Sequence, residues 1–351
     1  MIHGSYKWLS KLPGDGESRR LSRRVFLASA FAPPLLAQKP EISSFDLSLL
    51  DQPATPNDLF FVHEHFAAPN VTAANWKLAV SGAVAAPVEL PFDDLAARPR
   101  KSLAVTLECA QNPAGGGMVS HAEWTGVSLA SLLQSARPAA NAGAVRFTGA
   151  DGFSREIPFA KAMAPDSLLA LTMNGEKLPV NHGFPVRALI PGWYGMESVK
   201  WLRSIDVLAG QNDPKEYVRE VRSLLLGRQR AGAVTAMNVK SAFSRPLDGA
   251  TLFGRRFILR GVAWAGENRV RLVNVSVDGG KSWQPARLDS EPKPYAWVFW
   301  SHEWKIAGPG SYELAVTATD DQGREQPAER ASNRADDYEW NQRQVIQVAV
   351  S

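Results

Sequence analysis

Hydrophobic and polar residues of this 351-residue chain follow two different patterns, which predict two regions of different architecture. Up to about residue 232, short apolar runs typical of β-strands are separated by loops rich in proline and glycine. The runs are Trp76–Ser81, Leu103–Leu107, Val145–Thr148, Val186–Ile190 and Ile205–Leu208. Brief helical patterns lie between them, over Phe92–Ala97, Leu129–Ala136 and Pro158–Ala164. Because strands and helices do not alternate regularly, we expect a mixed α/β domain over residues 41–232 rather than a doubly wound sheet.

After Ala236 the alternation becomes regular, with the period of two that is typical of strands with one buried face. The runs are Arg256–Ala263, Val270–Val277, Ala296–Ser301, Tyr312–Thr319 and Val345–Val350. Turn sequences such as Gly308-Pro309-Gly310 separate them. The pattern predicts an all-β, immunoglobulin-like sandwich over residues 236–351. The expected fold class is therefore α+β, a mixed α/β domain followed by this sandwich.

The first 37 residues match neither pattern and are typical of an export signal. Arg23 and Arg24 precede an apolar stretch of about a dozen residues that runs to Leu36, and Ala37 is a small residue suited to cleavage. A membrane-spanning helix needs roughly 20 apolar residues, and no run in the sequence is that long. We expect residues 1–37 to be a twin-arginine signal that directs the folded protein to the periplasm. The charged segment Glu216–Arg230 is expected to form an exposed linker.

The net charge of +4 does not indicate a nucleic-acid-binding protein, because the excess lies in the leader. Residues 1–37 contain six lysines and arginines against two acidic residues, and the remainder contains 33 basic and 33 acidic side chains. A content of 45% hydrophobic and 21% charged residues is that of a globular protein. We therefore expect a small-molecule substrate and no nucleic-acid partner.

Cys109 is the single cysteine of the chain, so the sequence excludes an internal disulfide and cysteine-ligated iron–sulfur or c-type haem groups. It ends an apolar run and precedes Gly115-Gly116-Gly117, a loop with room for a bulky ligand. A lone thiol in an oxidising compartment is prone to oxidation unless it is buried or bonded to another group. Residue type alone favours an inert buried cysteine, whereas the neighbouring loop is suited to a ligand.

Two other motifs have structural explanations. His63 and His65 would share one face of a strand, which could suit zinc, but the chain has only six histidines and no HExxH motif. A role in the structure or in a polar pocket is therefore the favoured interpretation, with zinc as the alternative. Asp278–Ser282 resembles the end of a phosphate-binding loop, but Val275 stands where its first glycine is required. This segment is predicted to be a hairpin turn.

The segment Asn181–Leu202 combines three glycines that permit close backbone approach with two cations, Arg187 and Lys200, suited to a phosphate. Together with Met173–Glu176, it resembles the pterin-binding core of the sulfite oxidase family of molybdopterin-dependent oxidoreductases. Three further segments extend the resemblance. Phe60–His65 is similar to the family's Phe-Phe-x-Arg-Asn-His segment, Thr106–Ala110 to the strand that ends in the molybdenum-ligating cysteine, and Trp124–Leu129 to the Trp-x-Gly element. The resemblance covers the chain roughly from Thr55 to its C-terminus.

The resemblance implies one Mo-molybdopterin per chain, with Cys109 as the protein ligand of the molybdenum. The cofactor-binding residues that it implies are Phe61, Val62, His63, Glu64, His65, Cys109, Asp151, His182, Arg187, Ser198, Val199 and Lys200. The catalytic candidates are Cys109, His63 and Tyr194, with Tyr217 as a second candidate for the family's catalytic tyrosine. The C-terminal sandwich implies a homodimer.

The implied chemistry is two-electron oxygen-atom transfer, by default the oxidation of sulfite or a related sulfur compound. Because the chain has no haem motif, the electrons are expected to pass to a separate carrier such as a c-type cytochrome. Two departures concern the substrate. His63 stands where sulfite-oxidising members have an arginine, and Ala110-Gln111-Asn112-Pro113 stands where they commonly have Gly-Asn-Arg-Arg, so bidentate donors for a small anion are missing. An S-oxide or N-oxide reductase and a cofactor-free binding protein that uses its sandwich domain remain as alternatives.

Overall fold

The computed structural model describes residues 39–210, 234–330 and 338–351. The signal predicted over residues 1–37, the whole linker Glu216–Arg230 and the candidate Tyr217 within it lie outside the described residues. The described part contains five β-sheets and three short α-helices. Within it, no helix is both long and apolar enough to cross a membrane.

One sheet carries the strand that ends beside Cys109. Its strands are β5 (Arg100–Glu108), β6 (Val119–Ser128), β9 (Leu168–Met173), β10 (Glu176–Lys177) and β11 (Arg187–Leu189). β5 pairs with β6 and β6 with β9, and both β10 and β11 pair with β9, all antiparallel. β11 places Arg187 in this sheet, so that the sheet contains or adjoins two of the predicted site residues.

A second sheet forms the other part of the N-terminal region. Its order is β4 (Val88–Pro91), β3 (Lys77–Gly82), β12 (Leu202–Ala209), β7 (Ala142–Gly149) and β8 (Ser154–Pro158). β3 and β12 are parallel and the other neighbours antiparallel, which confirms a mixed rather than a doubly wound sheet. The short helices are α1 (Phe92–Ala96), α2 (Leu129–Ser135) and α3 (Phe159–Ala162). α2 is amphipathic and buries Leu129, Leu132 and Leu133 in the core of this region.

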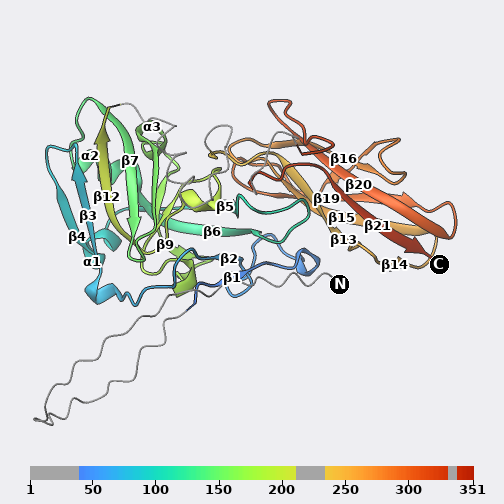
Figure 1. Cartoon of the computed structure of the whole chain (residues 1–351), viewed down its shortest axis with the longest axis horizontal. Coiled ribbons are helices and arrows are strands. Elements are labelled where there is room, and N and C mark those ends of the chain that lie inside the picture. Colours follow the sequence, from blue (N-terminus) through green and yellow to red (C-terminus); the bar gives the residue numbers. More distant parts are fainter. Residues whose placement is uncertain (1–38, 211–233, 331–337) are drawn as a thin grey trace, which may run out of the picture. The chain divides into compact units, whose positions relative to one another are not determined.

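The C-terminal region is a sandwich of two sheets, as its alternating pattern predicts (Figure 1, orange to red). One sheet has the order β13 (Lys240–Arg245), β15 (Arg256–Trp264), β19 (Val298–Lys305) and β18 (Arg287–Leu288). The other has the order β14 (Thr251–Leu252), β21 (Gln344–Val350), β20 (Gly310–Asp320), β16 (Val270–Ser276) and β17 (Gln284–Pro285). Leu259 and Trp300 from the first sheet share a buried cluster with Val273 and Leu314 from the second. This cluster is the core of the sandwich.

Several predicted elements differ in detail from the observed ones. β19 begins at Val298 and runs to Lys305, later than the predicted run Ala296–Ser301. The sequence pattern did not predict β6, since most of its residues are buried, including the polar Ser120 and His121, and it has no alternation to detect. Asp278 lies in the turn after β16, where its Oδ1 accepts hydrogen bonds from the backbone N–H groups of Lys281 and Ser282. The hairpin-turn prediction is therefore confirmed.

Close contacts join the sandwich to β5 and β6. The backbone N–H of Trp297 donates to Thr106 Oγ1 at 2.9 Å, and the backbone N–H of Thr106 donates to the Tyr295 carbonyl at 2.7 Å. Val119 of β6 shares a buried cluster with Val262 and Trp264 of β15. The strand that leads to Cys109 is thus held by residues of the C-terminal region.

Candidate functional site

A cavity lies where the segment around β2 (Val62–His63) meets the end of β5 and the turn that follows β11. β2 pairs with β1 (Ile42–Ser43), and two 3₁₀ turns, Val180–His182 and Gly195–Glu197, lie beside the cavity; two further 3₁₀ turns span Leu47–Leu49 and Ala73–Asn75. The empty volume is about 790 Å³, including space open to solvent.

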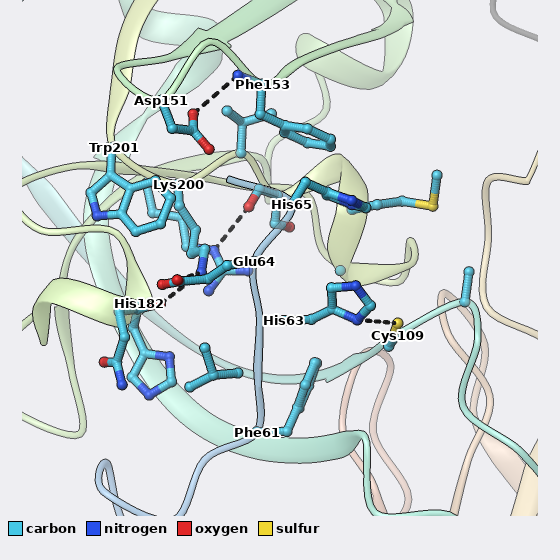
Figure 2. A pocket seen from close by; sticks show the side chains of 18 of the residues that line it. Phe61, His63, Glu64, His65, Cys109, Asp151, Phe153, His182, Lys200 and Trp201 are labelled. Carbon is cyan, nitrogen blue, oxygen red and sulfur yellow. Dashed lines mark hydrogen bonds and ion pairs between the residues drawn. The ribbon is translucent and has the colours of Figure 1, made fainter. Parts of the chain in front are cut away.

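All twelve predicted cofactor-binding residues line this cavity (Figure 2). They are Phe61, Val62, His63, Glu64, His65, Cys109, Asp151, His182, Arg187, Ser198, Val199 and Lys200. They come from four separate segments of the chain, which only the tertiary fold brings together. Their individual roles stay predictions, but the shared cavity is what binding of one ligand requires.

Cys109 follows the last residue of β5 and lies at one end of this group of side chains (Figure 2). Its backbone N–H donates to the Met118 carbonyl at 2.9 Å, and its Sγ lies 3.4 Å from His63 Nδ1. Burial raises the pKa of the Cys109 thiol to about 11. The free thiol is therefore protonated at neutral pH, and binding of a soft metal would release that proton.

The three histidines of the cavity are desolvated. Burial lowers the pKa of His63, and it lowers those of His65 and His182 to about 4. The ring of His65 stacks on Phe153 with centroids 4.7 Å apart and an interplanar angle of 9°. His182 lies 3.0 Å through Nε2 from the carbonyl of Asn57, so a neutral imidazole donates its proton there. At neutral pH these rings are uncharged hydrogen-bonding groups.

Two buried cations lie in the part of the cavity formed by the segment after His182. Arg187 Nε donates to the carbonyl of Ser198 at 3.0 Å. Lys200 Nζ donates to the carbonyl of Asn181 at 2.8 Å and lies 3.5 Å from a carboxylate oxygen of Glu64. Burial lowers the pKa of Arg187 to about 9 and that of Lys200 to about 8. Glu64 and Asp151 partly balance the charge of Lys200, but two desolvated cations in one cavity still favour an anionic ligand such as a phosphate.

Gly183 allows the segments that carry these cations to approach each other. Its φ of +107° is in a region that side chains other than glycine rarely adopt. A Cβ atom there would lie 3.1 Å from Cα of Lys200 and 3.2 Å from Cβ of Arg187. The backbone segments that carry the two cations can therefore lie this close together only because residue 183 is a glycine, as the sequence suggested.

The donor set fits a molybdopterin. A soft thiol lies at one end of the cavity and buried cations lie elsewhere on its wall, which suits a ligand with a soft metal and an anionic tail. In the described ranges, no three or more histidine, cysteine, aspartate or glutamate side chains are grouped so that they could hold a metal ion. His63 and His65 thus lack, among these residues, the additional protein ligands of a typical zinc site.

Tyr194, a catalytic candidate from the sequence, does not line the cavity. Its side chain is buried, and Nδ2 of Asn238 lies 3.4 Å from its hydroxyl. Burial raises the pKa of this hydroxyl well above 10. This placement does not favour a catalytic role for Tyr194, because its side chain is buried behind Ala110 and Tyr338, which do line the cavity.

Other lining residues were not among the predicted cofactor-binding or catalytic residues. They are Phe60, Ala110, Gln111, Phe153, Asn181, Gly195, Met196, Trp201 and Tyr338. Phe153 lies two residues after Asp151, and the backbone N–H of Phe153 donates to Asp151 Oδ1 at 3.1 Å. Because aspartate commonly accepts such a bond in a turn, Asp151 could have pointed to Phe153 as its neighbour. Tyr338 gave no signal, since it reaches the cavity from the C-terminal region.

Comparisons with known proteins agree with this site. Residues 65–216 match the oxidoreductase molybdopterin binding domain, and residues 231–346 match the Mo-co oxidoreductase dimerisation domain. The chain is 33% identical to sulfite oxidase of Gallus gallus over 333 residues, which cover 84% of this chain and 71% of that protein. It is 33% identical to mitochondrial sulfite oxidase of Homo sapiens over 311 residues, which cover 78% of this chain but only 57% of that protein.

A similar solved structure is the crystal structure of the sulfane dehydrogenase SoxCD from Paracoccus pantotrophus. The TM-score is 0.78 at 28% sequence identity, and the match covers 89% of this chain and 86% of that one. Both domain models match the chain, a sulfite oxidase matches most of its length, and the predicted residues lie around one cavity. These three findings lead to the same assignment. The chain belongs to the sulfite oxidase family of molybdopterin-dependent oxidoreductases.

Proposed function

We propose that this protein is an exported molybdopterin enzyme that oxidises sulfite or a related sulfur compound and passes the electrons to a separate carrier. The observation that carries the proposal is the position of the Cys109 thiol in a cavity whose wall also contains Arg187 and Lys200. The relatives named sulfite oxidase and sulfane dehydrogenase support a sulfur compound as the substrate.

The residues of the cavity divide between holding the cofactor and receiving the substrate. Cys109 would ligate the molybdenum through its thiolate, and Arg187 and Lys200 would bind the phosphate of the pterin. When bound, the cofactor supplies the two-electron oxygen-atom transfer. His65, held by stacking on Phe153, would offer the pterin a rigid flat surface.

The substrate would enter next to Cys109, where His63 and Gln111 line the cavity. Both side chains can form hydrogen bonds and are uncharged at neutral pH. Gln111 carries an amide, and desolvation lowers the pKa of His63. They would orient the oxygen atoms of a sulfur group by hydrogen bonds rather than by ion pairs. His63 thereby replaces the arginine of sulfite-oxidising members with a neutral group.

Export, the carrier and the oligomer complete the proposal. The twin-arginine motif at Arg23 and Arg24 supports export to the periplasm. A c-type cytochrome would accept the electrons there. The match of residues 231–346 to a dimerisation domain supports a homodimer.

The test is to purify the exported protein and to measure molybdenum per chain by mass spectrometry and sulfite oxidation with cytochrome c. We expect about one molybdenum per chain and turnover that Cys109→Ser abolishes in a folded protein. Activity only with a reduced carrier and an S-oxide or N-oxide would favour the reductase. No molybdenum, from a host that loads other molybdoenzymes, would contradict the proposal and favour a cofactor-free binding protein.

A further inference from the structure

A buried carboxylate precedes Cys109 in the chain. The side chain of Glu108 has no exposed surface, and three side chains donate hydrogen bonds to it. Lys240 Nζ lies 2.6 Å and Asn112 Nδ2 lies 3.1 Å from its Oε1, and Trp264 Nε1 lies 2.8 Å from its Oε2. Both oxygens of the carboxylate are therefore bonded, and Lys240 forms the ion pair.

Two of these three donors belong to the C-terminal sandwich. Lys240 begins β13 and Trp264 ends β15, and these residues face each other in the register of the two strands. Only 2% of the surface of Lys240 is exposed. The sandwich thus presents one cation and one indole N–H to the carboxylate beside the predicted molybdenum ligand.

The loop after Cys109 is tied to the same ion pair. Lys240 Nζ also donates to the carbonyl of Asn112 at 2.9 Å. The backbone N–H of Asn112 donates to the carbonyl of Cys109 at 2.9 Å, and Asn112 Oδ1 accepts from the backbone N–H of Met118 at 3.0 Å. Since Met118 in turn accepts from the backbone N–H of Cys109, the bonds form a closed network around this residue.

A buried ion pair is an inefficient way to stabilise a fold, because both charges lose their hydration. Hydrophobic residues of similar volume would often do as well at this junction. What the pair provides is a fixed position and a fixed local charge. Both effects act one residue away from the thiolate, where small displacements and nearby charges change the properties of a bound metal.

We propose that Lys240 is a positioning residue for the molybdenum centre. Through the carboxylate of Glu108 it fixes the loop that carries Cys109, and it balances the negative charge next to the thiolate. The C-terminal sandwich, which matches the dimerisation domain, thereby also supports the cofactor site in the N-terminal region. The inference rests on Cys109 as the molybdenum ligand, which is part of the proposed function.

The test compares holoenzymes that carry Lys240→Met, Glu108→Gln or both, each at a measured molybdenum content. The readouts are the reduction potential and the electron paramagnetic resonance spectrum of the half-reduced metal, with kcat and KM per molybdenum. Lys240→Met leaves a negative charge that favours the oxidised metal, so the potential falls. Glu108→Gln leaves a positive charge, so the potential rises. In each single variant kcat falls about 100-fold, as for a displaced catalytic group, while KM changes little.

The double variant and a control separate positioning from stability. With both charges removed, the potential of Glu108→Gln/Lys240→Met returns towards that of the wild type. Leu314→Ala opens a cavity in the sandwich core and lowers the melting temperature, but leaves the potential and the spectrum unchanged. If Lys240→Met does not fold, Glu108→Gln and the double variant still decide the question.

Unchanged potential, spectrum and kcat in the folded variants would overturn the inference, as would the same shifts in Leu314→Ala. Cys109→Ser, measured in parallel, tests the underlying assignment. If Cys109→Ser keeps the wild-type spectrum, the proposed role of Cys109 is wrong. If Cys109→Ser loses that spectrum and the Lys240 and Glu108 variants keep it, only the positioning role is wrong.

Discussion

His63 Nδ1 lies 3.4 Å from Cys109 Sγ, although the two residues are 46 positions apart in the chain. The imidazole is therefore beside the group that is proposed to ligate the molybdenum, at the place where a substrate would approach it. Desolvation lowers the pKa of His63, so this neighbour is neutral at pH 7.

Replacing His63 by arginine is expected to improve the binding of sulfite. A permanent guanidinium donates two charge-assisted hydrogen bonds to a small anion, whereas the neutral imidazole donates at most one. At about 1.5 kcal/mol for a hydrogen bond to a charged group, KM for sulfite should fall about tenfold. The change in KM is measured by steady-state kinetics, with rates normalised to the molybdenum content. His63→Gln is the neutral control, and an equal fall in both variants would contradict the electrostatic explanation.

Retention of the cofactor should decrease as the pH rises above 8. The pKa of Lys200 is lowered to about 8 by burial first and by the nearby Arg187 second, so the free site loses a positive charge above that pH. An anionic phosphate binds the charged site more tightly, and its affinity is constant below pH 8 and falls above it. Retention of the cofactor is measured as the molybdenum and pterin content that remains after dialysis at pH 7 and at pH 9.5. In Lys200→Met we expect weaker retention at pH 7 and a smaller further loss at pH 9.5.

Gly183→Ala is expected to destabilise the protein and to weaken cofactor binding. The new Cβ would clash with the backbone of Lys200 in a conformation that already disfavours side chains, which together cost about 1–3 kcal/mol of the free energy of unfolding. Urea unfolding of the apoprotein and the molybdenum content of the holoprotein measure the two effects. Gly175→Ala is the matched control, because its φ is +79° and no atom lies within 4 Å of its Cβ position. An equal loss of cofactor in both variants would exclude the clash as the cause.

The apoprotein should lose stability below pH 6.5, in part through His121. Burial lowers the pKa of His121 to about 4, from 6.5 for the free side chain. Between pH 6.5 and 4 the unfolded state therefore binds a proton that the folded state does not, and the free energy of unfolding falls by up to about 1.4 kcal/mol per pH unit. Chemical denaturation at pH 7, 5.5 and 4.5 measures this slope. Since His65, His182 and carboxylates also contribute, the diagnostic result is a shallower slope in His121→Gln, and an unchanged slope would contradict the prediction.

The sequence could predict those elements whose burial has a regular period. β21 of the sandwich buries one face in an alternating pattern and was recognisable for that reason. β6 was not, because most of its residues are buried on both faces and several are polar, such as Ser120, which accepts a hydrogen bond from the backbone N–H of Phe61. A local sequence pattern does not reveal hydrogen bonds between residues that are far apart in the chain.

The site was predictable to the extent that its residues lie in recognisable segments. His182, Arg187 and Lys200 share one segment and were found together through the family resemblance. Lys240 and Tyr338 were not found, because neither lies near a motif. Lys240 reaches Glu108 and Asn112, and Tyr338 reaches the cavity, from the other domain. Tyr194 was selected as a tyrosine within a glycine-rich motif, and sequence could not show that it is buried outside the cavity lining.

Tyr338 lines the cavity together with Cys109, although 229 positions separate the two residues in the chain. During synthesis, a nascent polypeptide of 330 residues would already contain every predicted cofactor-binding side chain but would lack this part of the wall. The wall is complete only after residue 338 has left the ribosome and the C-terminal region has folded. The two domains would therefore form the cofactor pocket jointly rather than in the order in which they are translated.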